Sequence, residues 1–288
     1  MILCIVGPTG VGKTKLSIEL AKYYNAVIIN GDSMQVYKEL NIGTAKVTNE
    51  EKCGIPHYLF DIKDVNEMYT VYDYQRDLRK IIDNNKNKNI IIVGGTGLYI
   101  KAGLYNYIFN EEDSNNNYDN LTNEELYELV LKKDEYCDIH INNRKRMIRF
   151  LNKSDSLKDK DNLLYDVRFI GLTCDRDTLY KRINLRVDKM IDDGLIDEVK
   201  SLYDRGIKSK SVMTGIGYKE LYDYFDGNIN LDDAVELIKK RSRKYAKRQY
   251  TWFNNQMDIN WFNVDFDNFN NTINEIIGYI EEFNGRVI

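Results

Sequence analysis

The sequence contains little of what cross-links a chain or carries it into a membrane. Only two prolines occur among 288 residues, and the four cysteines are scattered without a CxxC pair. This spacing argues against a zinc site or a disulfide framework, and we expect a reducing, cytoplasmic environment. No apolar run approaches the roughly 18 residues of a membrane-spanning helix, and we expect neither a membrane segment nor a secretory signal.

The chain also lacks an overall excess of basic charge, with one local exception. The net charge is −4, so composition gives no general sign of nucleic-acid binding. Between Lys239 and Arg248, however, seven of ten residues are Lys or Arg, and no acid occurs from Leu237 to Met257. Such a run favours contact with a phosphate backbone, although a solvated helix face is the ordinary alternative.

Short apolar runs alternate with segments of helical periodicity. This alternation predicts an α/β fold, a P-loop NTPase-like parallel sheet flanked by helices. The expected strands are Ile2–Val6, Ala26–Asn30, Asn89–Val93, Asp166–Cys174 and Ile259–Val264. The expected helices are Val11–Tyr24, Thr70–Asp83, Thr96–Leu104, one long helix after Cys174 through Arg205, and a last one near Asn270–Glu282.

Two polar stretches interrupt the alternation. Asn110–Asn120 and Asn152–Asp161 read as loops, and Thr122–Leu151 between them reads as purely helical. We therefore expect an inserted helical subdomain at 109–161. The core would comprise 1–108 and 162–288 and would include the basic C-terminal helix.

A phosphate-binding motif follows the first strand. The pattern GxxxxGK[ST] is matched directly between a strand and a helix by Gly7, Pro8, Thr9, Gly10, Val11, Gly12, Lys13 and Thr14. Its amides and the helix N-terminus attract phosphate oxygens, Lys13 neutralises the terminal phosphate, and the Thr14 hydroxyl can hold Mg²⁺. The motif predicts a diphosphate site.

The other polar residues near strand ends allow two interpretations each. No acid follows the strand ending at Val93, which disfavours a plain nucleotide hydrolase. Asp32 is a candidate general base, or it caps a helix at 33–37. Thr96 either caps the next helix or points into the same cleft. Arg182 and Arg186 lie four residues apart and so share a helix face. They either form a diphosphate clamp or belong to a salt-bridged, solvated face near Asp188.

The order of several motifs resembles that of the tRNA dimethylallyltransferase family, of the bacterial type. The resemblance covers residues 1 to about 265. It is carried by GPTGVGKT at Gly7–Thr14, GDSMQVY at Gly31–Tyr37, IGTAK at Ile42–Lys46, IPHYLFD at Ile55–Asp61, GGTGLY at Gly94–Tyr99, NNRKRMIRFL at Asn142–Leu151, RVDKMIDDGLIDEV at Arg186–Val199, TGIGYKE at Thr214–Glu220 and AKRQYTWF at Ala246–Phe253.

The resemblance implies transfer of a dimethylallyl group from dimethylallyl diphosphate to N6 of adenosine 37 in tRNA, with Mg²⁺ as cofactor. The P-loop would hold the diphosphate as a leaving group, with Lys13 and the two arginines against it. Asp32 would accept a proton from the attacking amine, with Thr96 beside it. The P-loop also implies nucleotide binding of the ATP type.

The resemblance further implies contact with the tRNA anticodon stem-loop. The residues implied are Asp32, Ser33, Met34, Gln35, Thr96, Arg144, Arg146, Gly217, Lys247, Arg248, Gln249 and Trp252. The sequence departs from the family at 105–120, where it has no Lys or Arg; Tyr118 could replace the missing basic contact only by stacking or by its hydroxyl. We expect a monomer.

Three other functions share parts of this pattern. A P-loop small-molecule kinase has the same loop and arginines but does not explain the basic helix. A prenyltransferase acting on free adenine nucleotides would use the same chemistry without a macromolecular acceptor. A non-enzymatic RNA-binding module leaves the P-loop and Asp32 without a purpose.

Overall fold

A computed structural model describes residues 1–109, 118–135, 137–152 and 162–285. The chain divides into two compact units, Met1–Tyr105 with Leu163–Ile288, and Asn106–Asn162. The loops expected at 110–120 and 152–161 lie largely outside the described residues. Among the helices of the described segments, none is long and apolar enough to cross a membrane.

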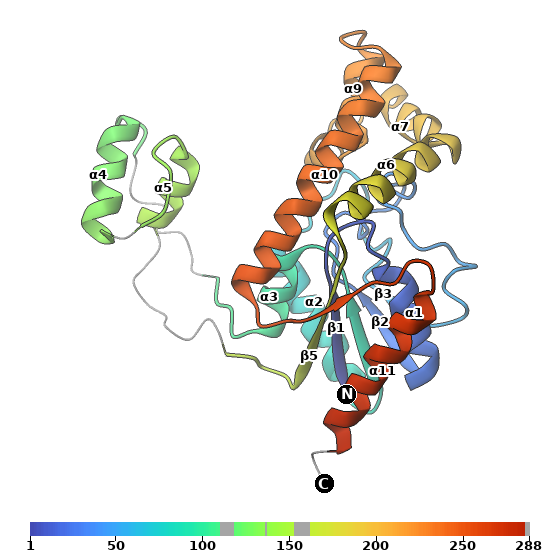
Figure 1. Ribbon diagram of the computed structural model, residues 1–288. Coiled ribbons are helices and arrows are strands. Elements are labelled where there is room, and N and C mark those ends of the chain that lie inside the picture. Colours follow the sequence, from blue (N-terminus) through green and yellow to red (C-terminus); the bar gives the residue numbers. More distant parts are fainter. Residues whose placement is uncertain (110–117, 136, 153–161, 286–288) are drawn as a thin grey trace. The chain divides into compact units, whose positions relative to one another are not determined.

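A six-stranded parallel sheet forms the centre of the larger unit (Figure 1). Its order is β3-β2-β4-β1-β5-β6, and every pairing is parallel. The strands are β1 Ile2–Val6, β2 Ala26–Asn30, β3 His57–Tyr58, β4 Asn89–Val93, β5 Val167–Thr173 and β6 Asn260–Asn263. The predicted α/β class is confirmed, whereas the short edge strand β3 was not anticipated because two residues carry no periodicity.

Nine helices complete the described part of this unit. They are α1 Lys13–Tyr24, α2 Val71–Asn84, α3 Gly97–Leu104, α6 Arg176–Asp192, α7 Leu195–Asp204, α8 Lys210–Thr214, α9 Tyr218–Phe225, α10 Leu231–Gln256 and α11 Phe269–Gly285. The single helix expected through Arg205 is wrong. Gly194 has φ 101° and separates α6 from α7, in the left-handed region that favours glycine.

Side chains of alternate strand residues divide the core between the two faces of the sheet. Cys4 and Ile92 face the cluster that contains α2 and α3, whereas Leu3 and Ile91 face the cluster that contains α1 and α11. These side chains are fully buried. Fully burying one aliphatic side chain stabilises the fold by about 1.5–3 kcal/mol, so both faces contribute.

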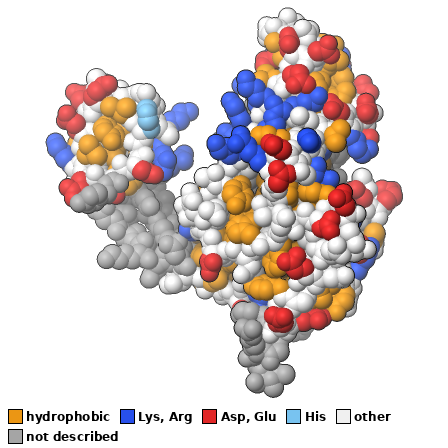
Figure 2. Space-filling model, in the orientation of Figure 1, with side chains coloured by type: hydrophobic (Ala, Val, Ile, Leu, Met, Phe, Trp, Pro, Cys, Tyr) orange, Lys and Arg blue, Asp and Glu red, His pale blue; other side chains and the backbone are white. Residues whose placement is uncertain are grey.

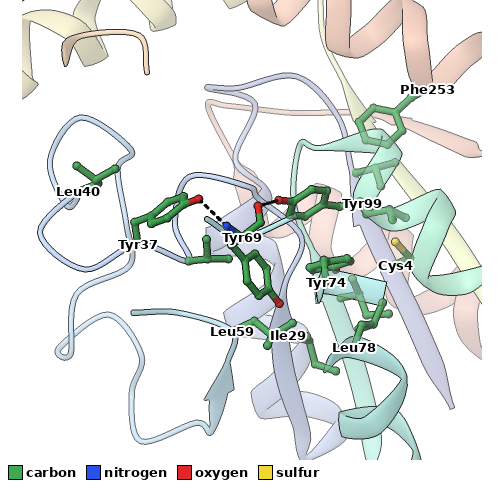
Figure 3. Packing of buried hydrophobic residues seen from close by; sticks show 14 of the residues in the cluster. Cys4, Ile29, Tyr37, Leu40, Leu59, Tyr69, Tyr74, Leu78, Tyr99 and Phe253 are labelled. Atoms are coloured by element: carbon green, nitrogen blue, oxygen red, sulfur yellow. Dashed lines mark hydrogen bonds between the residues drawn. The ribbon is translucent and has the colours of Figure 1, made fainter. Parts of the chain in front are cut away.

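Four tyrosines fasten the loop after β2 to this core (Figure 3). The rings of Tyr74 and Tyr99 stack with centroids 4.6 Å apart. The Tyr99 hydroxyl donates to the Tyr69 carbonyl at 3.2 Å, and the Tyr69 amide donates to the Tyr37 hydroxyl at 3.2 Å. The chain around Tyr37 is thus held against α2 and α3.

Three loops converge at the carboxyl edge of the sheet, where ligands bind in open α/β folds. They follow β1, β2 and β4. The backbones of the last two touch, because the Gly31 amide donates to the Val93 carbonyl at 2.8 Å and the Gly31 carbonyl accepts from the Thr96 amide at 3.1 Å. A Cβ on Gly94 would lie 2.1 Å from the Gly31 carbonyl carbon. Only glycine allows this approach.

The smaller unit contains two helices, α4 Asn123–Lys133 and α5 Arg144–Leu151. Its core is formed by Leu126, Val130, Ile139 and Met147. The expectation that Thr122–Leu151 is purely helical is wrong, since the described residues between α4 and α5 form turns and coil. The assignment of 109–161 as an inserted subdomain stays a proposal.

Candidate functional site

The P-loop wraps around the amine of Lys13. Gly12, with φ 102°, precedes the helix, and the Lys13 Nζ donates to the carbonyls of Gly7 at 2.9 Å and Pro8 at 2.8 Å. Burial and the neighbouring Arg186 lower the pKa of Lys13 to about 7, and the Asp32 charge opposes the shift. An anion here would be drawn to a charged amine and to a helix N-terminus.

Both arginines of α6 face this loop. Arg186 Nη1 donates to the Thr9 hydroxyl at 3.2 Å, and Arg182 Nε donates to the Gly10 carbonyl at 3.3 Å. Asp188, the acid of the salt-bridge alternative, pairs with Lys239 at 2.7 Å instead. The structure brings both arginines to the P-loop; their action as a diphosphate clamp stays a prediction.

A locked turn at the end of β2 presents Asp32. The side chain of the buried Asn30 donates from Nδ2 to the carbonyls of Asp32 and Leu59, both at 2.9 Å. Its Oδ1 accepts from the backbone amide of Asp32 at 2.9 Å. No helix forms at 33–37, so the helix-capping interpretation fails. The Asp32 Oδ1 accepts from the Met34 amide at 2.8 Å, and Oδ2 lies 4.0 Å from where a Cβ on Gly95 would be.

Thr96 joins the loops after β2 and β4. Its side chain makes no capping bond to α3, but accepts from the Ser33 amide at 3.0 Å and donates to the Ser33 hydroxyl at 3.2 Å. Of the two interpretations of Thr96, the cap is therefore wrong. The Thr96 hydroxyl therefore contacts Ser33, the residue that follows Asp32 in the chain.

Gln249 of α10 connects the P-loop to the loop after β4. Its Oε1 accepts from the Thr9 amide at 2.8 Å and its Nε2 donates to the Gly95 carbonyl at 3.0 Å. The side chain is only 5% exposed. Nearby on α10, Trp252 packs so closely on Gly97 that a Cβ there would lie 2.0 Å from its ring. The tRNA contacts expected of both residues stay predictions.

Two adjoining cavities meet at this point. The P-loop cavity, of about 480 Å³, is lined by Lys13 and Thr14 among others. The aliphatic cavity, of about 300 Å³, is lined by Ile183, Ile216 and Ser242 among others. Both cavities are lined by Thr9, Asp32, Thr44, Arg186 and Tyr245. The candidate base therefore lies where the cavities join.

The remaining residues implied for tRNA contact near Asp32 line the same space. Ser33 and Met34 line the aliphatic cavity, as does Gly217 at the start of α9. Gln35 lines the P-loop cavity and donates from Nε2 to the Thr44 carbonyl at 2.9 Å. The structure brings these residues together around Asp32, and their contact with tRNA stays a prediction.

The wall that carries Thr44 depends on residues that sequence reasoning missed. Glu198 of α7 accepts from the amides of Ile42 at 2.8 Å and Gly43 at 3.2 Å, and from the Tyr218 hydroxyl at 2.6 Å. The largely buried Lys46 pairs with Asp61 at 2.6 Å. Glu198 lies within one of the motifs quoted above, but nothing in its sequence context indicates a partner some 155 residues away.

The basic run of α10 divides into two sets. The first set bonds to side chains of the same unit: Lys239 to Asp188, Arg241 to Glu220 and Arg243 to Asn184. The second set, which we call the basic stripe, is Lys240, Lys244, Lys247 and Arg248. Their side chains are exposed, and their three- and four-residue spacing places them on one helix face. Figure 2 shows Lys and Arg side chains gathered over α10.

The two arginines implied for tRNA contact in the smaller unit differ in their partners. Arg144 donates to the carbonyls of Leu121 and Tyr118, both at 2.7 Å, and so holds its own unit together. Arg146 is exposed and lies 3.5 Å from Asp138. The implied tRNA contacts of both, and of Tyr118, stay predictions.

Comparison with known proteins decides the family. The family model described as IPP transferase matches residues 35–256. The chain belongs to the IPP transferase family. The tRNA dimethylallyltransferase of Anoxybacillus flavithermus is 49% identical, over 97% of this chain and 96% of that protein. That of Bacillus anthracis is 48% identical, over 97% and 95%.

Solved structures of the family agree with this assignment. The tRNA isopentenylpyrophosphate transferase of Bacillus halodurans is 43% identical, with a TM-score of 0.76 over 98% of this chain and 95% of that one. A eukaryotic dimethylallyltransferase acting on tRNA is 29% identical, with a TM-score of 0.77 over 91% of this chain and 73% of that one. The resemblance drawn from the motif order is confirmed.

Proposed function

We propose that this chain transfers a dimethylallyl group from dimethylallyl diphosphate to N6 of adenosine 37 in tRNA and releases diphosphate. The observation that carries the proposal is the junction of the two cavities at Asp32. One cavity offers a phosphate cradle and the other an aliphatic chamber, so two unlike substrates can meet at one carboxylate. Relatives at 48–49% identity are named tRNA dimethylallyltransferases.

The P-loop cavity would hold the diphosphate of the donor. As the bond between C1 and oxygen breaks, negative charge grows on the leaving group. The charged amine of Lys13 and the guanidinium of Arg186 lie beside the space where that charge develops. Donors that are already in place stabilise such charge without reorganisation.

The residues present fit Mg²⁺ only as a substrate-bridged ion. Among the described residues, no group of three His, Cys, Asp or Glu is placed to hold a metal. The exposed Thr14 at the P-loop cavity offers one hydroxyl, and Mg²⁺ commonly takes its other ligands from phosphates and water. A bound Mg²⁺ would neutralise part of the diphosphate charge.

Asp32 would serve the acceptor. The N6 amine of adenine is a weak nucleophile because its lone pair is delocalised into the ring. A carboxylate that accepts an N6 proton as the C1–N6 bond forms makes this attack feasible. The Met34 amide donates to Oδ1, whereas Oδ2 lies near Gly95 and accepts no hydrogen bond from the described residues. The target base would leave the anticodon-loop stack to reach it.

The basic stripe would bind the phosphate backbone of the anticodon stem-loop. The carboxyl-terminal end of the basic stripe lies next to the aliphatic cavity, because Arg248 lines that cavity. A stem-loop held there would present a loop nucleotide to Asp32. A monomeric, cytoplasmic enzyme, as expected from the sequence, is part of this proposal.

Mass spectrometry of tRNA after incubation with dimethylallyl diphosphate and Mg²⁺ tests the function directly. We expect one nucleoside beside the anticodon to gain the mass of a dimethylallyl group, and a stem-loop lacking adenosine 37 to gain none. Prenylation of free AMP at a comparable rate would move the assignment to a nucleotide prenyltransferase. Phosphoryl transfer from ATP without prenylation would move it to a kinase.

A further inference from the structure

The chain after β6 packs against the P-loop, although it lies beyond the residues that the family model matches. Phe266 of this segment lies under Arg182, whose guanidinium carbon is 3.8 Å from the centre of the ring. Phe269, at the start of α11, is only 8% exposed, and a Cβ on Gly12 would lie 2.9 Å from its ring. Figure 1 shows α11 beside α1, the helix that follows the P-loop. Two aromatic rings of the carboxyl-terminal segment therefore lie against the groups around the P-loop cavity.

A turn held by hydrogen bonds places Phe266. The Asp265 Oδ1 accepts from the backbone amides of Asp267 at 3.0 Å and Asn268 at 2.8 Å. The backbone amide of Asp265 donates to the hydroxyl of the buried Thr272 at 2.9 Å, which ties the turn to α11. Bonds of this kind, from an aspartate to the backbone that follows it, fix a turn locally. The ring of Phe266 is thus held in place before any ligand binds.

The contact with Phe266 leaves hydrogen-bond donors of Arg182 available. A guanidinium over an aromatic ring can keep N–H groups at its edge for other partners. Arg182 Nε donates to the Gly10 carbonyl at 3.3 Å, and none of the described residues accepts a hydrogen bond from Nη1 or Nη2. Arg182 also lines the P-loop cavity. Its two Nη groups are therefore available to an anion in that cavity.

Arg182 needs such support more than Arg186 does. The side chain of Arg186 is half-buried and bonds to the Thr9 hydroxyl, whereas that of Arg182 is exposed. An exposed arginine loses rotamer freedom when it binds an anion, and this loss of entropy weakens binding. Contacts with Phe266 and Gly10 restrict Arg182 in advance, so less entropy is lost when the anion arrives.

We propose that Phe266 is a positioning residue that holds the Arg182 guanidinium beside the P-loop cavity for the diphosphate. This inference rests on the proposed function, in which that cavity takes the diphosphate of the prenyl donor. Phe266 lines neither the P-loop cavity nor the aliphatic cavity, so it acts through Arg182. The segment after β6 thereby contributes to the donor site.

Calorimetric titration of the full chain with inorganic pyrophosphate and Mg²⁺ tests the inference without tRNA. Phe266→Leu keeps an apolar side chain but removes the aromatic face, and we expect Kd for pyrophosphate to rise about 5-fold. Phe266→Tyr keeps the face and should stay within about 2-fold of wild type. In prenyl transfer, Phe266→Leu should raise KM for dimethylallyl diphosphate by the same factor and leave KM for the stem-loop unchanged.

Two further comparisons separate positioning from folding. In an Arg182→Ala background, Phe266→Leu should not weaken pyrophosphate binding further, because the group that it positions is gone. Tyr180→Leu is the matched control, since this ring also lies under an arginine of α6. The guanidinium carbon of Arg176 is 5.2 Å from its centre, and Tyr180 lines neither cavity. The control should bind pyrophosphate as the wild type does.

Several outcomes would overturn the inference. Wild-type affinity for pyrophosphate in Phe266→Leu would remove Phe266 from the donor site, and equal losses in the Leu and Tyr variants would show that the aromatic face does not matter. A similar loss in Tyr180→Leu, or an undiminished effect in the Arg182→Ala background, would indicate general destabilisation. If the wild type bound pyrophosphate but transferred no prenyl group, the proposed function would be contradicted, and the binding data would still decide the role of Phe266.

Discussion

The two cavities that meet at Asp32 are built in different ways. The P-loop cavity takes most of its candidate phosphate-binding groups from one continuous segment, 7–14, shaped by a strand, a glycine turn and a helix; α6 adds Arg182 and Arg186. The aliphatic cavity is assembled from segments as distant as Met34, Ile183, Ile216 and Ser242. The first depends on local backbone geometry, and the second depends on how α6, α9 and α10 pack around the sheet.

The two cavities also differ in the charges that line them. Around the P-loop, Lys13 and Arg186 line the cavity and are held there by bonds to the loop before any ligand arrives. The aliphatic cavity offers apolar side chains and few charges, apart from those at the junction and Arg248. A site that recognises charge suits a diphosphate, and a site that recognises shape suits a flipped base. The following variants test this division.

The largest effect is expected at the junction. Asp32→Ala should lower the single-turnover rate of prenyl transfer by at least about 100-fold, because a positioned base is lost. Affinities for donor and for stem-loop should stay close to wild type, since Asp32 contributes to neither the P-loop bonds nor the basic stripe. Rapid-quench measurement of prenylated stem-loop checks this, and near-normal chemistry would exclude Asp32 from the reaction.

The next effect concerns the charge of Lys13. At pH 6 we expect Lys13→Met to weaken donor binding about 30-fold, the cost of a charge-assisted hydrogen bond. The pKa of Lys13 in the free protein is lowered to about 7, so the amine is charged below this pH and neutral above it. A bound diphosphate favours the charged form, and the gap in donor affinity between wild type and variant should narrow as pH rises above 7.

Calorimetric titration of both proteins from pH 6 to pH 9 measures this gap. The difference between the two proteins isolates Lys13, because ionisation of the diphosphate itself affects both equally. A gap that stays constant over the whole range would mean that the amine does not titrate in the free site. If Lys13→Met instead weakened stem-loop binding and left donor binding unchanged, the assignment of the donor to the P-loop cavity and of the base to the aliphatic cavity would be contradicted.

Sequence reasoning succeeded where structure is decided locally. The P-loop, β2 and β4 were predicted with correct strand bounds, because short apolar runs ending in glycine leave few alternatives. The convergence of Asp32 and Thr96 followed from the rule that parallel strands place their carboxyl ends together. In each case the information lies within a few residues of the group concerned.

It failed where a side chain finds a distant partner. Gln249 bonds to Thr9, 240 residues away, and a glutamine within a basic run gives no sign of such a bond. The bonds of Arg144 to carbonyls of its own unit were likewise not anticipated, and its contact with tRNA stays a prediction. The break at Gly194 was missed because the apolar periodicity continues on both sides of it.

The aliphatic cavity can be tested by narrowing it. Ser242→Leu adds an apolar side chain to its wall, and we expect KM for the stem-loop to rise about 10-fold, as for overpacking of a fitted site. Donor affinity should remain unchanged. Ser201→Leu, on the exposed face of α7, is the matched control. If Ser242→Leu instead weakened donor binding, the aliphatic cavity would belong to the prenyl group and not to the base.

The smallest effect is expected from the basic stripe, of which only Arg248 lines one of the two cavities. Replacing Lys247 and Arg248 by alanine should weaken stem-loop binding about 5-fold and reduce the slope of log Kd against log salt by about 1.4, if each contacts one phosphate of a single-stranded loop. Lys86→Ala with Lys88→Ala removes the same charge near the amino-terminal end of β4 and is the control. Fluorescence anisotropy of a labelled stem-loop over a salt series distinguishes the pairs. Equal slopes in the two double variants would mean that net charge attracts the RNA and that the stripe itself makes no contact.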